Sequence, residues 1–209
     1  MERTNEDLKI WANIVQNAEL EKDIEDAEEQ TLISTGRDQI LDEMPMVYDI
    51  YNGDRQDADD TLHYQTDGLN SSKLTPVADH GTFKTFRNPR GDAYLAYNQE
   101  GKCIGLLRGS KNGSIFEIEN TISDSQSGTK GVMFTLFMDC ISQGNKIISD
   151  VTQSPAAKSF WQRLVTSGHL VYFVVHGEVK GKVTPENMNK LWTDDVYNDA
   201  ADIRLLLVK

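Results

Sequence analysis

The sequence predicts a mixed fold of the α+β or α/β class, in which a mostly antiparallel sheet is flanked by helices and preceded by an acidic helical region. Three observations predict it. Negative charge is concentrated in residues 1–70, short β-like runs with Gly- and Asn-containing turns follow residue 80, and strands then alternate with helices from residue 122 onward. We therefore expect an acidic helical region with a linker over residues 1–75 and a compact domain over residues 76–209.

The charge of the chain is unevenly distributed around a formal net charge of −12. Residues 1–70 contain 19 acidic and 5 basic side chains, a balance of −14, whereas residues 71–209 contain 14 acidic and 16 basic ones, a balance of +2. An acidic surface repels phosphate backbones, so we expect no nucleic-acid partner. Residues 1–70 form either a solvated helical face or a surface for a protein partner.

Composition also limits the compartments in which the protein is expected to occur and the chemistry that it is expected to use. No apolar run reaches the roughly 20 residues that cross a bilayer, and the acidic start MERTNEDLKI lacks the apolar core of a secretory signal. Cys103 and Cys140 lie far apart in apolar runs and are expected to be buried free thiols in a reducing cytoplasm. The four histidines show no metal-ligand spacing, so no metal is expected.

The first third of the chain reads as helix and connector. Apolar side chains recur at helical spacing from Leu8 to Ala18 and predict one amphipathic helix. A second short helix is expected over residues 37–51, with a break or kink at Pro45. Residues 52–81 are rich in Asp, Gly, Asn and Ser and are expected to be a connector.

The rest of the chain reads as a meander followed by alternating helices and strands. The helix expected over residues 129–143 separates two strands, 115–122 and 146–151, which we expect to be neighbouring and parallel. The other expected elements are strands over 82–87, 93–98, 103–109, 169–177 and 201–209, a helix over 154–167 and a short helical turn over 184–192.

The turn Gly128-Thr129-Lys130-Gly131 stands where a strand meets a helix. The first N–H groups of that helix and its dipole favour an anion such as a pyrophosphate, and Lys130 adds a positive charge. The stretch is neither a P-loop nor a G-x-G-x-x-G motif. Spacing alone leaves both a structural turn and an anion site open.

The order of elements and two motifs resemble the GNAT acyltransferase superfamily, most closely its bacteriophage-encoded members. The family's [QR]-x-x-G-x-[GA] turn is matched by residues 128–133, with Gly131 at the glycine position, Gly128 in place of Gln or Arg, and Met133 in place of the small residue. The resemblance implies that acetyl-coenzyme A lies between the strands over 115–122 and 146–151. Its pyrophosphate would then contact Gly128, Thr129, Lys130, Gly131 and Val132.

The second motif lies in the helix over residues 154–167. Ala157, Phe160, Arg163 and Leu164 fit the family pattern, and Ser154 replaces its Asn, as a cofactor contact or as a helix cap. Trp161 stands where the family often places a Tyr that protonates the coenzyme A thiolate. An indole N–H cannot supply that proton, and we expect Trp161 to pack in the core.

Three carboxylates are candidates for the base that an acyl transfer to an amine requires. Glu117 and Glu119 alternate with Ile118 and therefore share one face of their strand, and Asp150 ends the next strand. Each has a plainer interpretation, as a solvated strand carboxylate or as a turn or cap residue.

Two functions follow from these observations. The first is a GNAT-like acyltransferase that moves an acetyl group from acetyl-coenzyme A to an amine of a protein or small molecule. The second is a catalytically inactive GNAT-like phage protein, in the host cytoplasm or the virion, that binds a structural or host protein through its acidic N-terminal arm. Met133, Trp161 and the balance of −14 favour the second.

Overall fold

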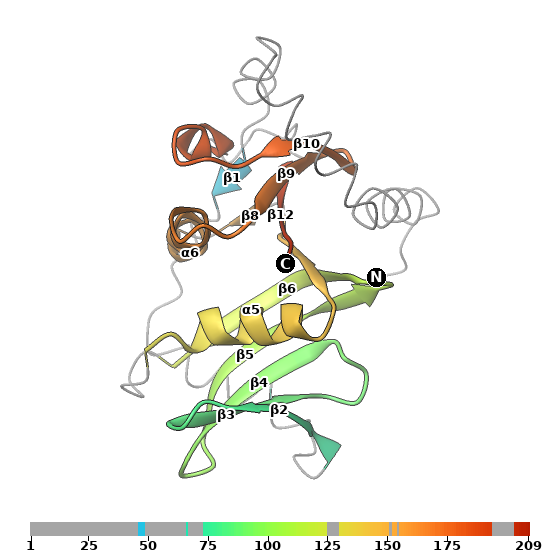
Figure 1. Ribbon diagram of the computed structural model, residues 1–209, viewed down its shortest axis with the longest axis vertical. Coiled ribbons are helices and arrows are strands. Elements are labelled where there is room, and N and C mark those ends of the chain that lie inside the picture. Colours follow the sequence, from blue (N-terminus) through green and yellow to red (C-terminus); the bar gives the residue numbers. More distant parts are fainter. Residues whose placement is uncertain are drawn as a thin grey trace. The chain divides into compact units, whose positions relative to one another are not determined.

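The computed structural model describes residues 46–48, 66, 73–124, 130–150, 152–153, 155–193 and 203–209. The chain forms two compact units (Figure 1). The meander unit holds the described residues from 66 to 111 and from 116 to 147. The C-terminal unit holds residues 46–48 and 112–115 and the described residues from 148 to the end.

Five successive strands build the sheet of the meander unit, in the order β6-β5-β4-β3-β2. From β2 to β5, each strand pairs antiparallel with the next. β7 (Lys146–Ile148) begins in this unit next to β6 and carries the chain into the other unit. The bounds are β2 Thr75–Asp79, β3 Phe83–Arg87, β4 Ala93–Asn98, β5 Cys103–Asn112 and β6 Ile115–Ser123.

Two hairpin turns of this sheet repeat one design, Asn-x-x-Gly. In the β3–β4 turn the Asn88 side-chain oxygen accepts bonds from two backbone amides, and Gly91 N–H donates to the Asn88 carbonyl at 3.0 Å. In the β4–β5 turn Asn98 and Gly101 repeat the arrangement. Both glycines have φ near +75°, a conformation that other residues adopt only with strain. The Asn and Gly residues that predict these hairpins in the sequence are therefore the residues that form the turns.

Helix α5 (Val132–Ser142) covers one face of this sheet (Figure 1). Its buried side chains include Val132 and Leu136, which pack on β5 at Gly105. A Cβ atom on Gly105 would lie 2.4 Å from Val132 Cγ1, so helix and strand approach as closely as they do because Gly105 has no side chain. On the opposite face of the sheet, Ala93, Leu95 and Leu106 form a second buried cluster.

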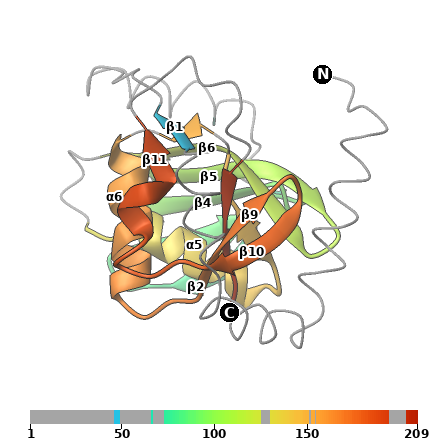
Figure 2. The ribbon, with the colours of Figure 1, turned by 90° about the horizontal axis from the view of Figure 1, so that it is seen from above.

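The C-terminal unit is built on the strand order β10-β9-β12, with both pairs antiparallel. The strands are β9 Val171–Val175, β10 Glu178–Lys182 and β12 Ile203–Leu207, and all five residues of β9 are buried. β9 and β10 form a hairpin (Figure 2). Its turn residues His176 and Gly177 both have positive φ, as in the two-residue turns that match strand twist.

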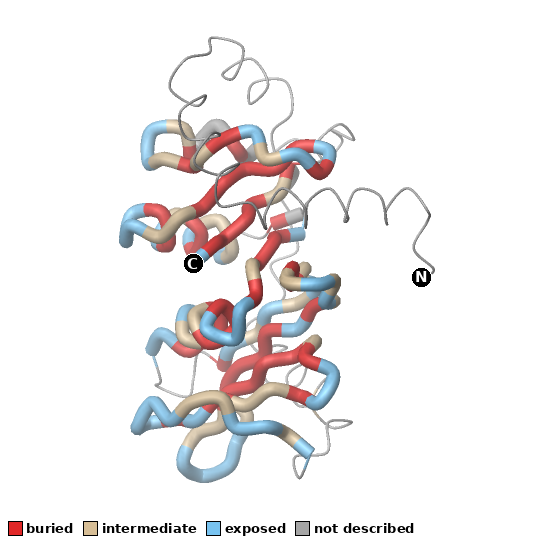
Figure 3. Tube along the Cα trace, turned by 45° about the vertical axis from the view of Figure 1, so that its right-hand side comes forward, coloured by how far each residue is buried: buried red, intermediate tan, exposed pale blue. Residues whose placement is uncertain are grey.

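The same unit holds helix α6 (Pro155–Thr166), the short 3₁₀ helix η2 (Met188–Leu191) and a small parallel sheet. In that sheet β1 (Met46–Tyr48) pairs with β11 (Trp192–Thr193) on one side and with β8 (Thr152–Gln153) on the other. Buried residues are concentrated in strands such as β4 and β5 of the meander unit and β9 of the C-terminal unit, whereas the hairpin turns are largely exposed (Figure 3).

The predicted mixed fold, with mostly antiparallel sheets flanked by helices, is confirmed. α5 and α6 lie within the predicted helices, and η2 lies within the predicted helical turn. Apart from residues 46–48 and 66, the predicted acidic helical region over 1–70 is outside the described residues, and the division at residue 75 stays a prediction.

Three local predictions were wrong. Residues 46–48, placed in a helix over 37–51, form the strand β1 because partners far along the chain pair with them on both sides. The expected connector over 52–81 contains β2, whose Pro76 is tolerated because β2 is the last strand of its sheet. β10 was not predicted, since the run Glu178–Lys182 is polar and holds a glycine. Among the described residues, no helix is both long and apolar enough to span a bilayer.

Candidate functional site

The start of α5 is the candidate site that the sequence singles out, and the structure describes part of it. Gly128 and Thr129 belong to residues 125–129, which lie outside the described residues. Lys130 and Gly131 are both exposed. Gly131 is the N-cap residue, and its carbonyl accepts the first helical bond from the Thr135 amide at 2.9 Å.

Gly131 gives this helix start an unusual geometry. Its φ of 80° and ψ of 5° are left-handed, whereas an ordinary N-cap is extended and closes the first turn with a side-chain oxygen. In the described part of the chain, no side chain caps this turn, and its first turn holds no acidic residue. A Cβ built on Gly131 meets no described atom within 4 Å, so φ rather than crowding favours glycine. The positive end of the helix is thus left without a carboxylate or hydroxyl from its own cap.

Val132 and Met133 follow in the first turn and differ in environment. Val132 is buried and anchored against Gly105, so it can offer a ligand only its backbone amide. Met133 is half-buried. At the position where the family pattern has a small residue, the chain therefore has a long side chain that is neither fully buried nor fully exposed.

An ion pair stands at the end of β6, the strand that precedes this turn. The Asp124 carboxylate is 4% exposed, and Lys102 Nζ lies 3.1 Å from one of its oxygens. The Asp124 amide also donates to the Ile104 carbonyl at 3.0 Å, which fixes the end of β6 on β5. A buried carboxylate without a partner would be costly, and Lys102 offsets its charge. No sequence pattern indicates this pair, because its members are 22 residues apart.

Glu117 and Glu119 lie on β6 in the meander unit, as predicted, and differ in exposure. Glu119 is exposed, whereas Glu117 is half-buried and accepts a bond from Ser110 Oγ at 3.4 Å. The backbone at Glu117 is held tightly by β5, because a Cβ on Gly109 would lie 2.0 Å from the Glu117 carbonyl oxygen. β6 therefore presents two carboxylates from a firmly fixed backbone.

Asp150 belongs to the C-terminal unit and lies beyond the end of β7 at Ile148, rather than ending that strand as predicted. The Asp150 carbonyl accepts bonds from Ser149 Oγ and from Gln153 Nε2, both at 2.8 Å. Ser149 Oγ also accepts a bond from the Leu205 amide at 2.9 Å. The Asp150 side chain is exposed, and Ser154 lies outside the described residues.

Trp161 closes this network from α6. Its side chain is buried, and its Nε1–H donates to Gln153 Oε1 at 3.2 Å. Its ring also contacts that of Phe160 edge to face, with 6.3 Å between centroids. The predicted core role of Trp161 is confirmed. Because its single donor is already used, this position supplies no proton to a ligand.

A further polar cluster joins the β2–β3 turn to α5 and has no sequence signal. His80 Nε2 lies 2.9 Å from Asp139 Oδ2, and the buried Thr85 hydroxyl donates to the same oxygen. Fifty-nine residues separate His80 from Asp139. The cluster fastens the edge of the sheet to the helix.

Burial governs the titration of the two thiols. Desolvation raises the pKa of Cys140 to about 12 and that of Cys103 to about 11. Both remain protonated and unreactive at neutral pH, as expected for structural cysteines. No group of three or more potential metal ligands occurs among the described residues.

No protein-family model matches the chain, and no curated protein matches it. Among solved structures, the chain resembles a protein proposed to be an acyl-CoA N-acyltransferase from Klebsiella pneumoniae, at 8% identity and a TM-score of 0.37, over 76% of this chain and 90% of that one.

Two more solved structures resemble it to a similar degree. One is a GNAT-family acetyltransferase from Staphylococcus aureus, at 12% identity and a TM-score of 0.35, over 85% of this chain and 96% of that one. The other is N-acetylglutamate synthase from Neisseria gonorrhoeae in complex with coenzyme A and N-acetylglutamate. It matches at 9% identity and a TM-score of 0.37, over 76% of this chain but only 33% of the synthase. Likenesses this low do not assign an activity to the chain.

Proposed function

We propose that the chain binds an acyl-coenzyme A at the start of α5 and transfers its acyl group, acetyl above all, to an amine of a protein or small molecule. One observation carries the proposal: α5 starts at a left-handed glycine that no described side chain caps, next to the exposed Lys130. Such a helix end favours an anion, and a pyrophosphate is the anion that the resemblance to GNAT enzymes implies.

The described residues are compatible with that anion. The first-turn backbone is held in place because Val132 is packed against Gly105, so its amide directions are fixed before a ligand arrives. No described atom lies within 4 Å of a Cβ built on Gly131, which leaves room for a ligand to approach its backbone closely. Lys102 offsets the charge of Asp124 at the end of β6. When bound, the coenzyme supplies the acyl group as a thioester.

The amine must lose a proton for the transfer to proceed, and the protein supplies carboxylates for it. We assign this role to Glu119, which is exposed, and to Glu117, whose carboxylate is oriented by Ser110. The firmly held backbone of β6 would keep either carboxylate in position. Asp150, exposed on the C-terminal unit, is the further candidate. Trp161 takes no part, because its N–H is bonded to Gln153.

Calorimetric titration of the full chain with acetyl-coenzyme A tests the binding step. We expect saturable binding that Lys130→Glu weakens by about tenfold, because a charge next to a phosphate is reversed. Lys111→Glu is the matched control, since Lys111 is also exposed but lies near the other end of β5. Absence of both heat and a thermal shift with acetyl-coenzyme A would rule the proposal out.

Release of free thiol in the presence of a panel of amines tests the chemistry. Glu119→Gln or Glu117→Gln is expected to lower kcat by about 10²-fold or more while acetyl-coenzyme A binding stays unchanged, because only the base is lost. If both variants keep full activity, the base is a different group and Asp150→Asn is the next variant.

A second candidate function is a catalytically inactive phage-type protein that binds a virion or host protein through residues 1–70. The observation that favours it is the buried, fully engaged Trp161 at the position where GNAT enzymes often place their proton donor. The test compares the full chain with a variant carrying E21Q, E25Q, E28Q and E29Q in affinity capture from bacterial lysate. A specific protein that is captured only by the unmodified chain, together with no response to acetyl-coenzyme A, would favour this second function.

A further inference from the structure

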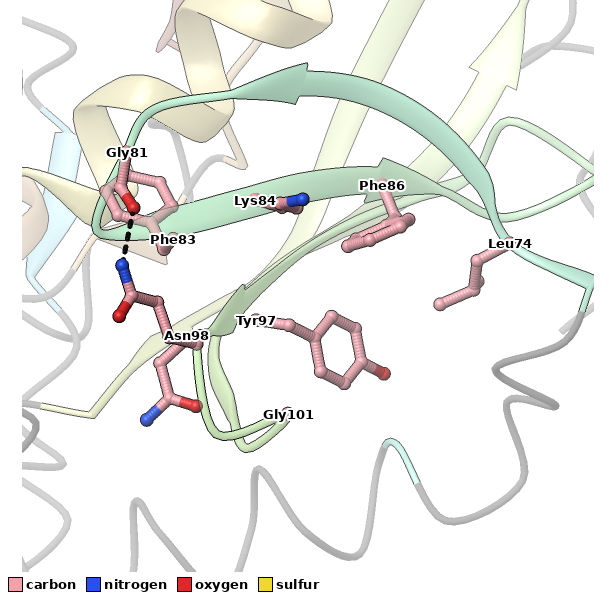
Figure 4. Close-up of a pocket in the computed structure, with 9 residues that line it drawn as sticks. Leu74, Gly81, Phe83, Lys84, Phe86, Tyr97, Asn98 and Gly101 are labelled. Carbon is pink, nitrogen blue, oxygen red and sulfur yellow. Dashed lines mark hydrogen bonds between the residues drawn. The ribbon is translucent and has the colours of Figure 1, made fainter.

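A pocket of about 460 Å³ opens in the meander unit at the end of the sheet where the β2–β3 and β4–β5 turns meet (Figure 4). Its volume falls in the range of small-molecule sites. Much of it faces away from α5, because Phe86 and Tyr97 alternate with residues whose side chains face the helix. It is lined by Leu74, Gly81, Phe83, Lys84, Phe86, Tyr97, Asn98, Gln99 and Gly101.

One end of the pocket is apolar and ring-lined. Phe86 and Tyr97 meet edge to face with 5.6 Å between ring centroids, and Leu74 lies beside them (Figure 4). All three side chains are only half-buried, so apolar surface is still available to a ligand. Desolvation raises the pKa of Tyr97, which keeps its hydroxyl neutral. Such an end suits a planar ring, which gains from edge and face contacts.

The other end of the pocket is polar and held by the hairpin turns. Gln99 Nε2 donates to the Gly81 carbonyl at 2.9 Å, which ties the β4–β5 turn to the β2–β3 turn (Figure 4). The Asn98 side-chain oxygen is occupied by the Glu100 and Lys102 amides, so the Asn98 amide nitrogen is the group left to face a ligand. These bonds within the protein already shape the end wall of the pocket before a ligand binds.

Lys84 gives the pocket its charge. Among the described residues that line the pocket it is the one cation, and none of them is acidic. Its Nζ lies 3.2 Å from Asp79, but both side chains are more than half exposed, at 63% and 57%. An ion pair this exposed contributes at most about 1 kcal/mol. Lys84 can therefore exchange Asp79 for another carboxylate at little cost.

We propose that this pocket binds a small molecule made of a planar apolar ring and one carboxylate, with the ring against Phe86 and Tyr97 and the carboxylate on Lys84. The site is separate from the start of α5 and does not depend on the proposed transferase activity. A ligand with a ring but no anionic group would leave Lys84 paired with Asp79. An anionic ligand without a ring would leave the apolar end of the pocket in contact with water. The pair of groups, rather than either alone, defines the ligand class.

Titration of the isotope-labelled full chain with 3-phenylpropionate, followed by amide NMR, tests the site. The expected result is saturable shifts at Gly81 and Gly101. Gly81 is the more sensitive reporter, because its amide donates to Asp79 and should respond when Lys84 leaves that carboxylate. The neutral analogue 3-phenylpropanamide is expected to bind the same residues about fivefold more weakly, the value of an exposed ion pair.

Two variants with opposite expected signs sharpen the test. Lys84→Gln should weaken 3-phenylpropionate about fivefold and leave the amide within about twofold. Asp79→Asn should instead tighten 3-phenylpropionate, because the competing carboxylate is gone, whereas Lys111→Gln should change neither. Phe86→Leu should weaken both probes, since it removes a ring but keeps an apolar side chain.

Three outcomes would overturn the proposal. They are no shifts at Gly81 and Gly101 with either probe, equal loss of both probes in Lys84→Gln, and shifts confined to the start of α5. Addition of acetyl-coenzyme A separates this site from the proposed function. Binding of 3-phenylpropionate should be the same with and without it, and should persist if acetyl-coenzyme A does not bind at all.

Discussion

The two ends of α5 are finished in different ways. At the C-terminal end, Gln143 N–H donates to the Asp139 and Cys140 carbonyls, Gly144 N–H donates to the Ile141 carbonyl, and the Asn145 side chain reaches back to Cys140 at 2.8 Å. At the N-terminal end, Gly131 has a left-handed backbone, and no described side chain caps the first turn.

The difference shows at which end of the helix the chain's own polar groups bond to the terminal backbone groups. Both ends of a helix leave backbone groups without intrahelical partners, and both have equal need of caps. Here the carbonyls of the last turn are bonded by the chain itself, so the C-terminal end serves the fold. The N-terminal end is fixed by the packing of Val132, and no described side chain caps it, so among the described residues its backbone groups are the ones an anion would meet.

The largest expected effect concerns the packing that fixes the N-terminal end. Gly105→Ala should lower the free energy of unfolding by about 2–3 kcal/mol, because the new Cβ would lie 2.4 Å from Val132 Cγ1. Urea unfolding measures the loss. In the double variant with Val132→Ala, part of the loss should be recovered, and strictly additive losses would show that the two residues are not in contact.

At the C-terminal end, Asn145→Ala should cost about 2 kcal/mol. The buried side chain donates to both Tyr94 Oη and the Cys140 carbonyl, and its removal takes one buried hydrogen bond from each of these acceptors. Ser142→Ala is the matched control. Ser142 Oγ donates to the Asp139 carbonyl near the surface, so its loss should stay within about 0.5 kcal/mol, and equal losses in both variants would contradict the comparison.

The buried thiol in the last turn of α5 should make stability fall in alkaline solution. Unfolded Cys140 ionises near its ordinary pKa of 9.0, whereas the folded thiol keeps its proton up to about pH 12. Between these values the unfolded state has released a proton that the folded state still holds. Each pH unit should therefore remove about 1.4 kcal/mol, and the full contribution is present below about pH 9.

Urea unfolding of the chain and of Cys140→Ala at a series of alkaline pH values isolates this contribution. The difference between the two proteins should shrink steadily above about pH 9. A constant difference would show that the thiol ionises equally in both states.

The smallest expected effect concerns the backbone at the N-terminal end. Gly131→Ala should cost about 1 kcal/mol, because a left-handed φ disfavours a Cβ even where no described atom would lie within 4 Å of it. Gly131→Asn should cost less, since Asn tolerates this conformation. Thermal unfolding resolves the two. A loss far above this value would mean that the side chain meets atoms, and that the end is not open.

The sequence predicts the fold best where local patterns and final contacts agree. The strands β3, β4 and β5 are recognisable because the two turns that join them are specified locally by Asn88, Gly91, Asn98 and Gly101. β1 is not, because three residues acquire strand structure only through partners about 100 and 145 positions further along the chain. Short strands that depend on distant pairing carry no periodic signal.

The candidate site divides in the same way. The glycine at position 131 and the shared strand of Glu117 and Glu119 follow from spacing and period. The Lys102–Asp124 pair and the bond from Trp161 to Gln153 do not, since each depends on how separate elements pack. Side-chain partners of this kind become visible only when the elements are placed in space.

Gly109 has a consequence for how β5 and β6 find each other during folding. At this point no Cβ fits between the strands, because it would lie 2.0 Å from the Glu117 carbonyl oxygen. A slip of one residue would bring Arg108 or Ser110 to the same place, and either would clash. The close approach at Gly109 thus disfavours the alignments of this hairpin that are shifted by one residue in either direction.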